Sequence, residues 1–296
     1  MRTMTVAFLG LGAIGAPMAR RVAARERELR VWNRTRARAE ALARELDVHA
    51  ADTPADAARG ATVVITCLPT SNELQALLDG GLESALEPGA VVVDCTSGSP
   101  EATRAIAARL AARGVGFVDA PVSGGVSGAE QGTLTVMCGG DASTVDRVRP
   151  VLESFGRKIV HVGPVGAGMA VKAVNNILLA AHVWTLGEGL ALLARSGVPA
   201  STALDVINAS SGRSNSSQNL FPERVVGRAF PRTFRLALLD KDAATAAAAL
   251  RDARVPSPLL QLTAELMRLA HVALGEEADH VEAVKVIEEW AGVRIG

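Results

Sequence analysis

The most informative segment of the sequence is VAFLGLGAIG, which runs from Val6 to Gly15. An apolar run typical of a buried strand ends here in a G-x-G-x-x-G turn, and an Ala- and Arg-rich helical pattern follows the turn. The second strand pattern ends at the distance expected for a dinucleotide-binding unit, at Val31–Thr35. An isolated glycine motif is weak evidence, but strand, turn and helix in this order predict a dinucleotide site.

The three glycines of this turn have separate physical roles. Gly10 permits the turn, Gly12 lets the backbone reach the pyrophosphate, and Gly15 allows close packing of the following helix. The phosphates then lie at the positive end of that helix. The predicted cofactor-binding residues of the turn are Gly10, Leu11, Gly12, Ala13, Ile14 and Gly15.

The residues after the second strand favour NADP over NAD. An NAD enzyme usually places an acidic side chain there to bind the ribose hydroxyls, whereas this chain has Asn33, Arg34 and Thr35. A carboxylate would repel a 2′-phosphate, but a guanidinium and a hydroxyl can bind one. Because Arg34 could also be an ordinary solvated arginine, NAD remains the alternative cofactor.

The order of apolar patterns predicts an α/β protein of two domains. Strands are expected near 4–9, 29–32, 62–66, 90–94, 115–118, 133–138 and 158–161, with helices between most of them. Such alternation predicts a doubly wound, parallel Rossmann sheet over residues 1–163. Beyond a Gly/Pro cluster the strand patterns stop, so residues 164–296 are expected to form an all-helical C-terminal domain.

The C-terminal domain is expected to begin with one long interdomain helix, over residues 167–195, ended by Gly197 as a C-cap. Further helices are expected near 200–209, 216–227, 235–253, 258–274 and 278–291. The apolar part of the long helix is interrupted by polar and glycine residues, which favours a buried helix of a soluble protein over a membrane span.

Bulk composition narrows the class of protein. The chain has 296 residues, with 31 basic and 31 acidic side chains, so neither nucleic acid nor an anionic membrane is expected as a partner. The three cysteines are widely spaced, and the N-terminus lacks the pattern of a signal peptide. We therefore expect a cytoplasmic protein with reduced thiols, and the histidine spacing predicts no metal site.

A second polar group lies far from the glycine turn. Lys172 and Asn176 are four residues apart on one face of the long apolar helix. A lysine among apolar residues is costly unless it has a task or a partner, although it can also extend its amine to the surface. The pair is therefore a candidate for proton transfer.

With these residues in view, the chain resembles the β-hydroxyacid dehydrogenase family, whose members include 3-hydroxyisobutyrate dehydrogenase and tartronate semialdehyde reductase. Four blocks carry the resemblance in the family's order: 8–19 around the glycine turn, Asp119–Gly125, Gly168 with Lys172, Asn175 and Asn176, and Lys241–Asp242. Four blocks at family spacing are more specific than any one of them.

The resemblance implies a role for each matching residue. Lys172 and Asn176 match the catalytic lysine and the asparagine that positions substrate and lysine, while Ser123, Gly124 and Gly125 match the loop that holds the substrate carboxylate. Asn175 is expected at the substrate as well. The residues that match cofactor contacts are Leu68, Pro69, Asn72, Phe234 and Lys241.

One block departs from the family pattern. The family often has Asp-x-Ser-Thr after the fifth strand, whereas this chain has Asp94-Cys95-Thr96-Ser97. A hydroxyl contact to the nicotinamide or ribose is kept, but either Thr96 or Ser97 could make it.

The sequence thus predicts an NADP(H)-dependent oxidoreductase that interconverts a small β-hydroxy acid and its semialdehyde, acting as a homodimer or homotetramer with the substrate in a cleft between domains. The alternatives are an imine reductase-like NADPH enzyme, in which Lys172 would be unusual, and a non-catalytic NADP-binding scaffold. Phosphogluconate dehydrogenase is disfavoured because Leu179 stands where that enzyme needs a glutamate.

Overall fold

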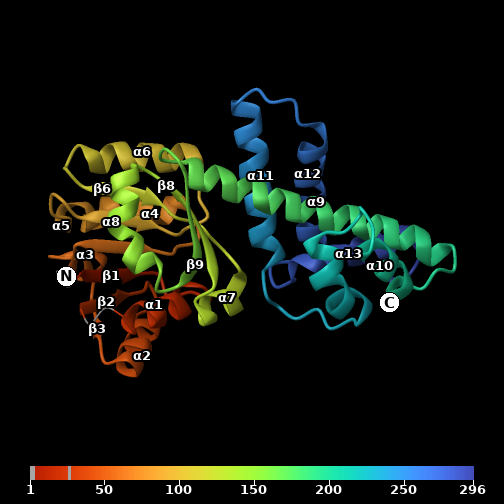
Figure 1. Ribbon diagram of the computed structural model, residues 1–296, viewed down its shortest axis with the longest axis horizontal. Helices are drawn as coiled ribbons and strands as arrows, with labels where there is room; N and C mark the ends of the chain where they lie inside the picture. Colours follow the sequence, from red (N-terminus) through yellow and green to blue (C-terminus); the bar gives the residue numbers. More distant parts are fainter. Residues whose placement is uncertain (1–3, 26–27) are drawn as a thin grey trace. The chain divides into compact units, whose positions relative to one another are not determined.

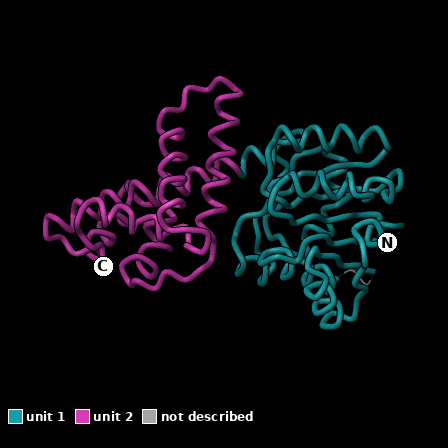
Figure 2. Tube along the Cα trace, turned by 180° about the vertical axis from the view of Figure 1, so that it is seen from behind, with its two compact units in different colours: residues 1–172 teal, residues 173–296 magenta. Residues whose placement is uncertain are grey.

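A computed structural model describes residues 4–25 and 28–296 of the chain. It divides into two compact units, residues 1–172 and residues 173–296, coloured separately in Figure 2. The last strand ends at Gly163 and the long helix begins at Ala167, so the first turns of that helix belong to unit 1.

Unit 1 is built on a nine-stranded sheet with helices on both faces (Figure 1). The strands are β1 (Thr5–Leu9), β2 (Glu28–Trp32), β3 (His49–Ala50), β4 (Val63–Thr66), β5 (Val91–Asp94), β6 (Gly116–Asp119), β7 (Val122–Ser123), β8 (Leu134–Gly139) and β9 (Gly156–Gly163). The order β3-β2-β1-β4-β5-β6 is parallel throughout, as predicted for a doubly wound fold.

The helices of unit 1 cover two apolar cores, one on each face of the sheet. They are α1 (Gly15–Ala23), α2 (Arg36–Leu46), α3 (Pro54–Ala58), α4 (Ser71–Leu77), the π-helical turn η1 (Leu78–Leu82), α5 (Glu83–Ala85), α6 (Pro100–Ala111), α7 (Gly125–Gln131) and α8 (Ala142–Leu152). Helices α1, α2 and α8 pack on one face, and α3, α4 and α6 pack on the other. Strands β4 and β5 are buried on both faces, which is why they read as continuous apolar runs.

The far edge of the sheet adds antiparallel pairing to the predicted parallel strands. Strand β8 pairs antiparallel with β6 and β7, and β9 then pairs parallel with β8. The connection from β6 to β8 passes through two residues of β7 and the short α7, and it returns the chain in the opposite direction. Strands β3 and β7 were not predicted, because two residues are too few to carry a hydrophobic period.

The regular secondary structure of unit 2 is helical, and the unit begins within α9 (Ala167–Arg195). The other helices are α10 (Ala200–Asn208), the π-helical η2 (Ser216–Val226), α11 (Leu236–Asp252), α12 (Pro258–Leu274), the 3₁₀ turn η3 (His280–Ala283) and α13 (Val284–Ala291). Gly197 ends α9 with a positive φ of 76°, and the N–H of Val198 returns to the Leu193 carbonyl, so the predicted C-cap is confirmed.

Helix α9 is long and apolar enough, by length and composition alone, to cross a membrane, a test that the core helix of a soluble protein also passes. Its residues Ile177, Val183 and Leu190 are fully buried in the apolar core of unit 2. The helix therefore supplies the centre of that core.

Candidate active site

The glycine turn after β1 has the geometry that a dinucleotide site requires. Gly10 has a φ of +102°, and a Cβ there would collide with the Cys67 carbonyl. A Cβ on Gly15 would collide with the carbonyl of Gly10, so α1 can approach the turn only with glycine at this position. A Cβ on Gly12 would meet nothing within 4 Å, so the backbone is open there to a pyrophosphate.

The N-terminus of α1 is suited to phosphate for a second reason. Its N-cap is Ile14, no side chain caps the first turn, and no acidic residue lies in that turn. The free backbone N–H groups and the helix dipole both favour an anion. Leu11 is buried and Ala13 is exposed, so the turn has one side in the core and one side toward solvent.

Asn33 links the end of β2 to the glycine turn. The backbone N–H of Leu11 donates to Asn33 Oδ1 over 2.9 Å, and Asn33 Nδ2 donates to the carbonyl of Thr35 over 3.0 Å. The Asn33 amide thus fixes the turn's position. Arg34 is exposed and has no hydrogen bond or ion pair with the described part of the chain.

Asp94 connects the ends of β4 and β5. The two loops that follow these strands contain predicted cofactor-binding residues. The hydroxyl of Thr66 and the N–H of Thr96 both donate to Asp94 Oδ1, over 2.8 and 3.1 Å. The N–H of Leu68 donates to the Thr96 hydroxyl over 3.1 Å. The Asp94 carboxyl is fully buried, and its Oδ2 has no hydrogen-bond partner among the described residues.

The two hydroxyls that the sequence left open, those of Thr96 and Ser97, differ in burial. Thr96 is 1% exposed and its hydroxyl already accepts from Leu68, whereas Ser97 is half-buried. Pro69 and Asn72 are both exposed, in the loop that leads to α4 and at its first turn. That helix begins in a capping box of Thr70 and Glu73, which fixes the loop's exit.

The loop predicted to hold a carboxylate follows β6 directly. Ser123 pairs with Thr135 of β8 at the end of β7, and Gly124 and Gly125 take positive φ values of 135° and 66°. Both glycines are exposed, and a Cβ on Gly125 would meet nothing within 4 Å. Accessible backbone N–H groups beside a hydroxyl can bind an anion.

Lys172 is the last residue of unit 1 and lies in the second turn of α9. Its side chain is half-buried. The first turn of α9 is held by Asp119, since the N–H groups of Gly166 and Met169 donate to its two carboxylate oxygens over 2.8 and 3.0 Å.

In unit 2, two of the predicted blocks meet in one chain of contacts. Asn175 Nδ2 donates to Asn176 Oδ1 over 3.0 Å, and Asn176 Nδ2 donates to Asp242 Oδ2 over 2.5 Å. Lys241 Nζ lies 3.0 Å from Asp242 Oδ1. Asn176 and Asp242 are 2% and 5% exposed, so this is a largely buried network and not a solvated ion pair. Phe234 precedes α11, half-buried, with its ring 5.5 Å from that of His280.

Sequence reasoning missed the roles of Asp94, Asp119 and Asp242. Each aspartate lies in one of the sequence motifs described above, but no hydrogen-bond partner was predicted for it. The signal for the first two was available, since an aspartate that ends a buried apolar strand must find hydrogen-bond donors. The partners themselves come from segments up to 66 residues away, which only the fold brings together.

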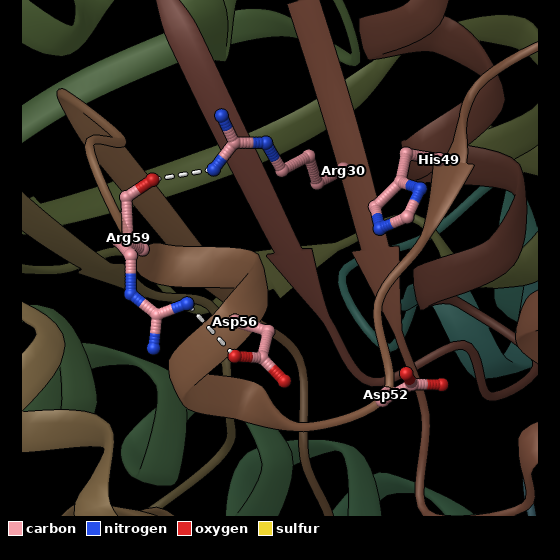
Figure 3. A pocket seen from close by; sticks show the side chains of 5 residues that line it. All are labelled: Arg30, His49, Asp52, Asp56 and Arg59. Atoms are coloured by element: carbon pink, nitrogen blue, oxygen red, sulfur yellow. Dashed lines mark hydrogen bonds and ion pairs between the residues drawn. The ribbon is translucent and has the colours of Figure 1, made fainter.

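Two other features lie away from these residues. A polar hollow of about 420 Å³ on the β2–β3 edge is lined by Arg30, His49, Asp52, Asp56 and Arg59 (Figure 3), and none of the predicted site residues lines it. Its arginines are engaged, Arg30 with the Arg59 carbonyl and Arg59 with Asp56. Over the described residues, no group of three or more His, Cys, Asp or Glu side chains could hold a metal.

The thiols have the environment of inert cysteines. Burial raises the pKa of Cys67 and of Cys138 to about 12 each, and the pKa of Cys95 also rises through burial. A thiolate is the reactive form, so none of the three is suited to be a nucleophile at neutral pH.

Comparison with known proteins matches both units. Residues 5–163 match the NAD binding domain of 6-phosphogluconate dehydrogenase, and residues 166–287 match the NAD-binding domain model of NADP-dependent 3-hydroxyisobutyrate dehydrogenase. A 2-(hydroxymethyl)glutarate dehydrogenase of Eubacterium barkeri is 33% identical over 99% of this chain and 98% of its own. An NAD-dependent L-serine dehydrogenase of Pseudomonas aeruginosa is 35% identical, over 89% of this chain and 91% of its own.

Among solved structures, a 3-hydroxyisobutyrate dehydrogenase of Mycobacterium tuberculosis with L-serine superposes with a TM-score of 0.90. It is 31% identical, and the match covers 96% of this chain and 99% of that one.

Proposed function

We propose that this chain, which belongs to the β-hydroxyacid dehydrogenase family, oxidises a hydroxymethyl group on a carbon that bears a carboxylate. In the reverse direction it reduces the matching semialdehyde, and NADP(H) is its preferred cofactor. That the chain is an NAD(P)-dependent oxidoreductase acting on CH–OH groups follows from its relatives. The substrate class, the NADP preference and the residue roles are the proposal.

The substrate class rests on what the relatives' names share. 2-(Hydroxymethyl)glutarate, L-serine and 3-hydroxyisobutyrate each carry a hydroxymethyl group on the carbon that bears the carboxylate. In this chain the loop Ser123–Gly125 supports the proposal, because its hydroxyl and accessible backbone N–H groups suit a carboxylate.

The single observation that carries the cofactor proposal is the open glycine turn. Gly12 leaves room at the backbone, and α1 begins beside it without any side-chain cap, so a pyrophosphate fits here. Arg34, exposed and without a partner in the described chain, would hold a 2′-phosphate. Ser97 is the better candidate for the nicotinamide-side contact, since it is half-buried whereas Thr96 is buried.

The residues of the chain then divide the work of the reaction. A bound nicotinamide supplies or accepts the hydride. Lys172 donates a proton to the carbonyl oxygen during reduction and removes it from the hydroxyl during oxidation. The Ser123–Gly125 loop holds the carboxylate, which fixes the reacting carbon, and the Asn176–Asp242–Lys241 network orders the helix face that follows Lys172.

The substrate proposal is tested by initial rates with purified protein. The panel pairs 3-hydroxyisobutyrate, L-serine and 2-(hydroxymethyl)glutarate with isobutanol, which lacks the carboxylate, and with a cyclic imine, each with both cofactors. We expect turnover of at least one carboxylate-bearing alcohol and a higher kcat/KM with NADP⁺ than with NAD⁺. Equal rates with isobutanol, or reduction of the imine alone, would refute the proposed substrate class.

The role of Lys172 is tested by Lys172→Ala. We expect turnover to fall by about a hundred- to ten-thousandfold, the usual contribution of general acid–base catalysis, while NADPH affinity changes by a few fold at most. Lys158→Ala, which removes an exposed lysine of β9, is the control and should leave turnover unchanged. An alanine variant with near-normal turnover would show that the proton comes from another group.

A further inference from the structure

Helix α9 begins without a cap of its own. Its first residue, Ala167, follows Gly166, which has no side chain, and the first turn holds no acidic residue. A helix start leaves several backbone N–H groups without partners, and they are usually satisfied by a Ser, Thr, Asp or Asn at the N-cap. Here the cap comes instead from Asp119, at the end of β6 and 47 residues away from Gly166.

Asp119 binds this helix start with both carboxylate oxygens. The N–H of Gly166 donates to Oδ1 over 2.8 Å and the N–H of Met169 donates to Oδ2 over 3.0 Å. Two bonds from a planar group to positions three residues apart fix the direction of the helix as well as its place. Burial raises the pKa of this fully buried carboxyl, and the backbone N–H groups of Gly166 and Met169 act against that rise.

Two glycines keep the carboxylate in close contact with its surroundings. A Cβ on Gly139 of β8, the register partner of Asp119, would lie 2.5 Å from its Oδ1. A Cβ on Gly168 would lie 2.8 Å from its Oδ2 and would also collide with the Met137 carbonyl. The Asp119 carboxylate is therefore closely packed between β8 and the first turn of α9, where neither glycine can carry a side chain without displacing it.

Backbone hydrogen bonds to neighbouring strands hold the chain between Asp119 and the loop that follows β6. The N–H of Ala120 donates to the Asp94 carbonyl over 2.7 Å, and the N–H of Met137 donates to the Pro121 carbonyl over 3.1 Å. Ser123 then pairs with Thr135 two residues later. On the other side, Lys172 lies three residues after Met169, in the next turn of the helix.

We propose that Asp119 is a positioning residue for proton transfer, holding Lys172 in fixed register with the carboxylate-binding loop Ser123–Gly125. The inference rests on the proposed function, in which Lys172 is the acid–base group. Asp119 does not touch the substrate in this account. It acts through the backbone of α9, and its loss displaces the amine of Lys172 relative to a substrate held by its carboxylate.

The test is Asp119→Asn, alone and combined with Lys172→Ala. The amide has the same shape but offers one acceptor, and its NH₂ faces the second backbone N–H. We expect kcat to fall by about ten- to a hundredfold, the size of a small misplacement of a catalytic group, with the Kd of NADPH within about twofold. In the Lys172→Ala background, the same change should alter the residual turnover by less than about twofold, because the group it positions is gone.

The matched control is Asp141→Asn. Asp141 caps α8 of the same unit by accepting from the N–H groups of Ser143 and Thr144, but α8 carries no predicted site residue. We expect its turnover to stay within about twofold of the parent. Should Asp119→Asn fail to fold, Gly139→Ala keeps the carboxylate and displaces it, and it should show a smaller loss of kcat with the same dependence on Lys172.

The outcomes separate the two levels of the proposal. Normal kcat in Asp119→Asn and Gly139→Ala, or an equal further loss in the Lys172→Ala background, would overturn the positioning role while leaving Lys172 as acid–base group. Normal turnover in Lys172→Ala itself would refute both the proposed proton transfer and the positioning role that rests on it.

Discussion

At the scale of single residues, the polar groups of unit 1 divide by what they contact. Asn33, Thr96 and Asp94 bind backbone and side chains within the fold, so their first task is to shape the loops. Arg34 is exposed and Ser97 is half-buried, and we propose that these two contact the cofactor's charged and polar groups. Residue type alone does not separate these tasks, because an asparagine or threonine can serve either.

Arg34→Ala tests the assignment of the 2′-phosphate. We expect NADPH binding to weaken by about 1.5–3 kcal/mol, the size of a charge-assisted hydrogen bond, and NADH binding to change little. The measurement is the Kd of each cofactor by titration calorimetry. Equal losses for both cofactors would contradict the claim that Arg34 recognises the 2′-phosphate.

Arg36→Ala is the control for that experiment. Arg36 is also exposed and two residues away, but it is engaged by Glu40 and Asp52 over 2.7 and 2.8 Å. Removing Arg36 changes the net charge by the same amount as removing Arg34, but it keeps the Arg34 guanidinium that we propose binds the 2′-phosphate. Its NADPH affinity should therefore remain near that of the parent.

Among the helices and strands, two buried aspartates join the end of a strand to a neighbouring element. Asp94 joins β5 to β4 through Thr66, and Asp119 joins β6 to α9. Parallel strands bring their carboxyl ends to one edge of the sheet, which is where ligands bind in such folds. A carboxylate placed there orders the loops that a ligand needs, at the cost of burying a charge.

Asp94 gives a pH dependence that can be measured. Burial raises its pKa from 3.8 to about 6, so the folded state binds a proton more tightly than the unfolded state does. This contribution to stability is complete below about pH 4 and is lost as the pH rises through 6. Two pKa units correspond to about 3 kcal/mol.

Asp94→Asn should therefore flatten the pH profile of stability. We expect the free energy of unfolding of the parent, relative to that of the variant, to fall by about 3 kcal/mol between pH 4 and pH 8, measured by urea denaturation. The difference in slope is the readout, because the amide also introduces an NH₂ group that needs a partner. Parallel profiles for parent and variant would show that Asp94 does not titrate in this range.

For the molecule as a whole, the helix α12 has an apolar face that is exposed in the described part of the chain. Leu259, Leu262, Leu269 and Val272 are 61, 55, 38 and 73% exposed, at spacings that place them within one helical face. An exposed apolar face of this kind is typical of an interaction site. Because the net charge of the chain is zero, copies of it do not repel one another electrostatically. We propose that copies of this chain associate through it as a dimer or tetramer.

Leu262→Asp tests this proposal. We expect the molar mass measured by light scattering to fall toward that of one chain, 30.6 kDa, because a charge cannot be buried in an apolar interface without a partner. Val206→Asp is the matched control, since Val206 of α10 is 63% exposed but lies outside this face. A parent that already runs as a monomer, or equal effects of both variants, would refute the role of α12.

The features that could be predicted from the sequence are those that depend on local patterns. The glycine turn, the order of strands and helices, the bounds of α9 and the family blocks are all readable, because periodicity, turn chemistry and apolar runs depend on neighbours in the chain. Two-residue strands and the reversal at β8 were not readable, because they depend on pairing between segments.

The contacts between distant side chains could be learned only from the folded protein. Asp119 reaches α9 across 47 residues, and Asp242 reaches Asn176 across 66. A buried polar group must find its hydrogen-bond partner within about 3 Å, but the sequence records only that a partner is required. The packing of distant elements fixes which group is that partner. At Asp119 and Asp242, the partner shows what the residue of the family motif does in the fold.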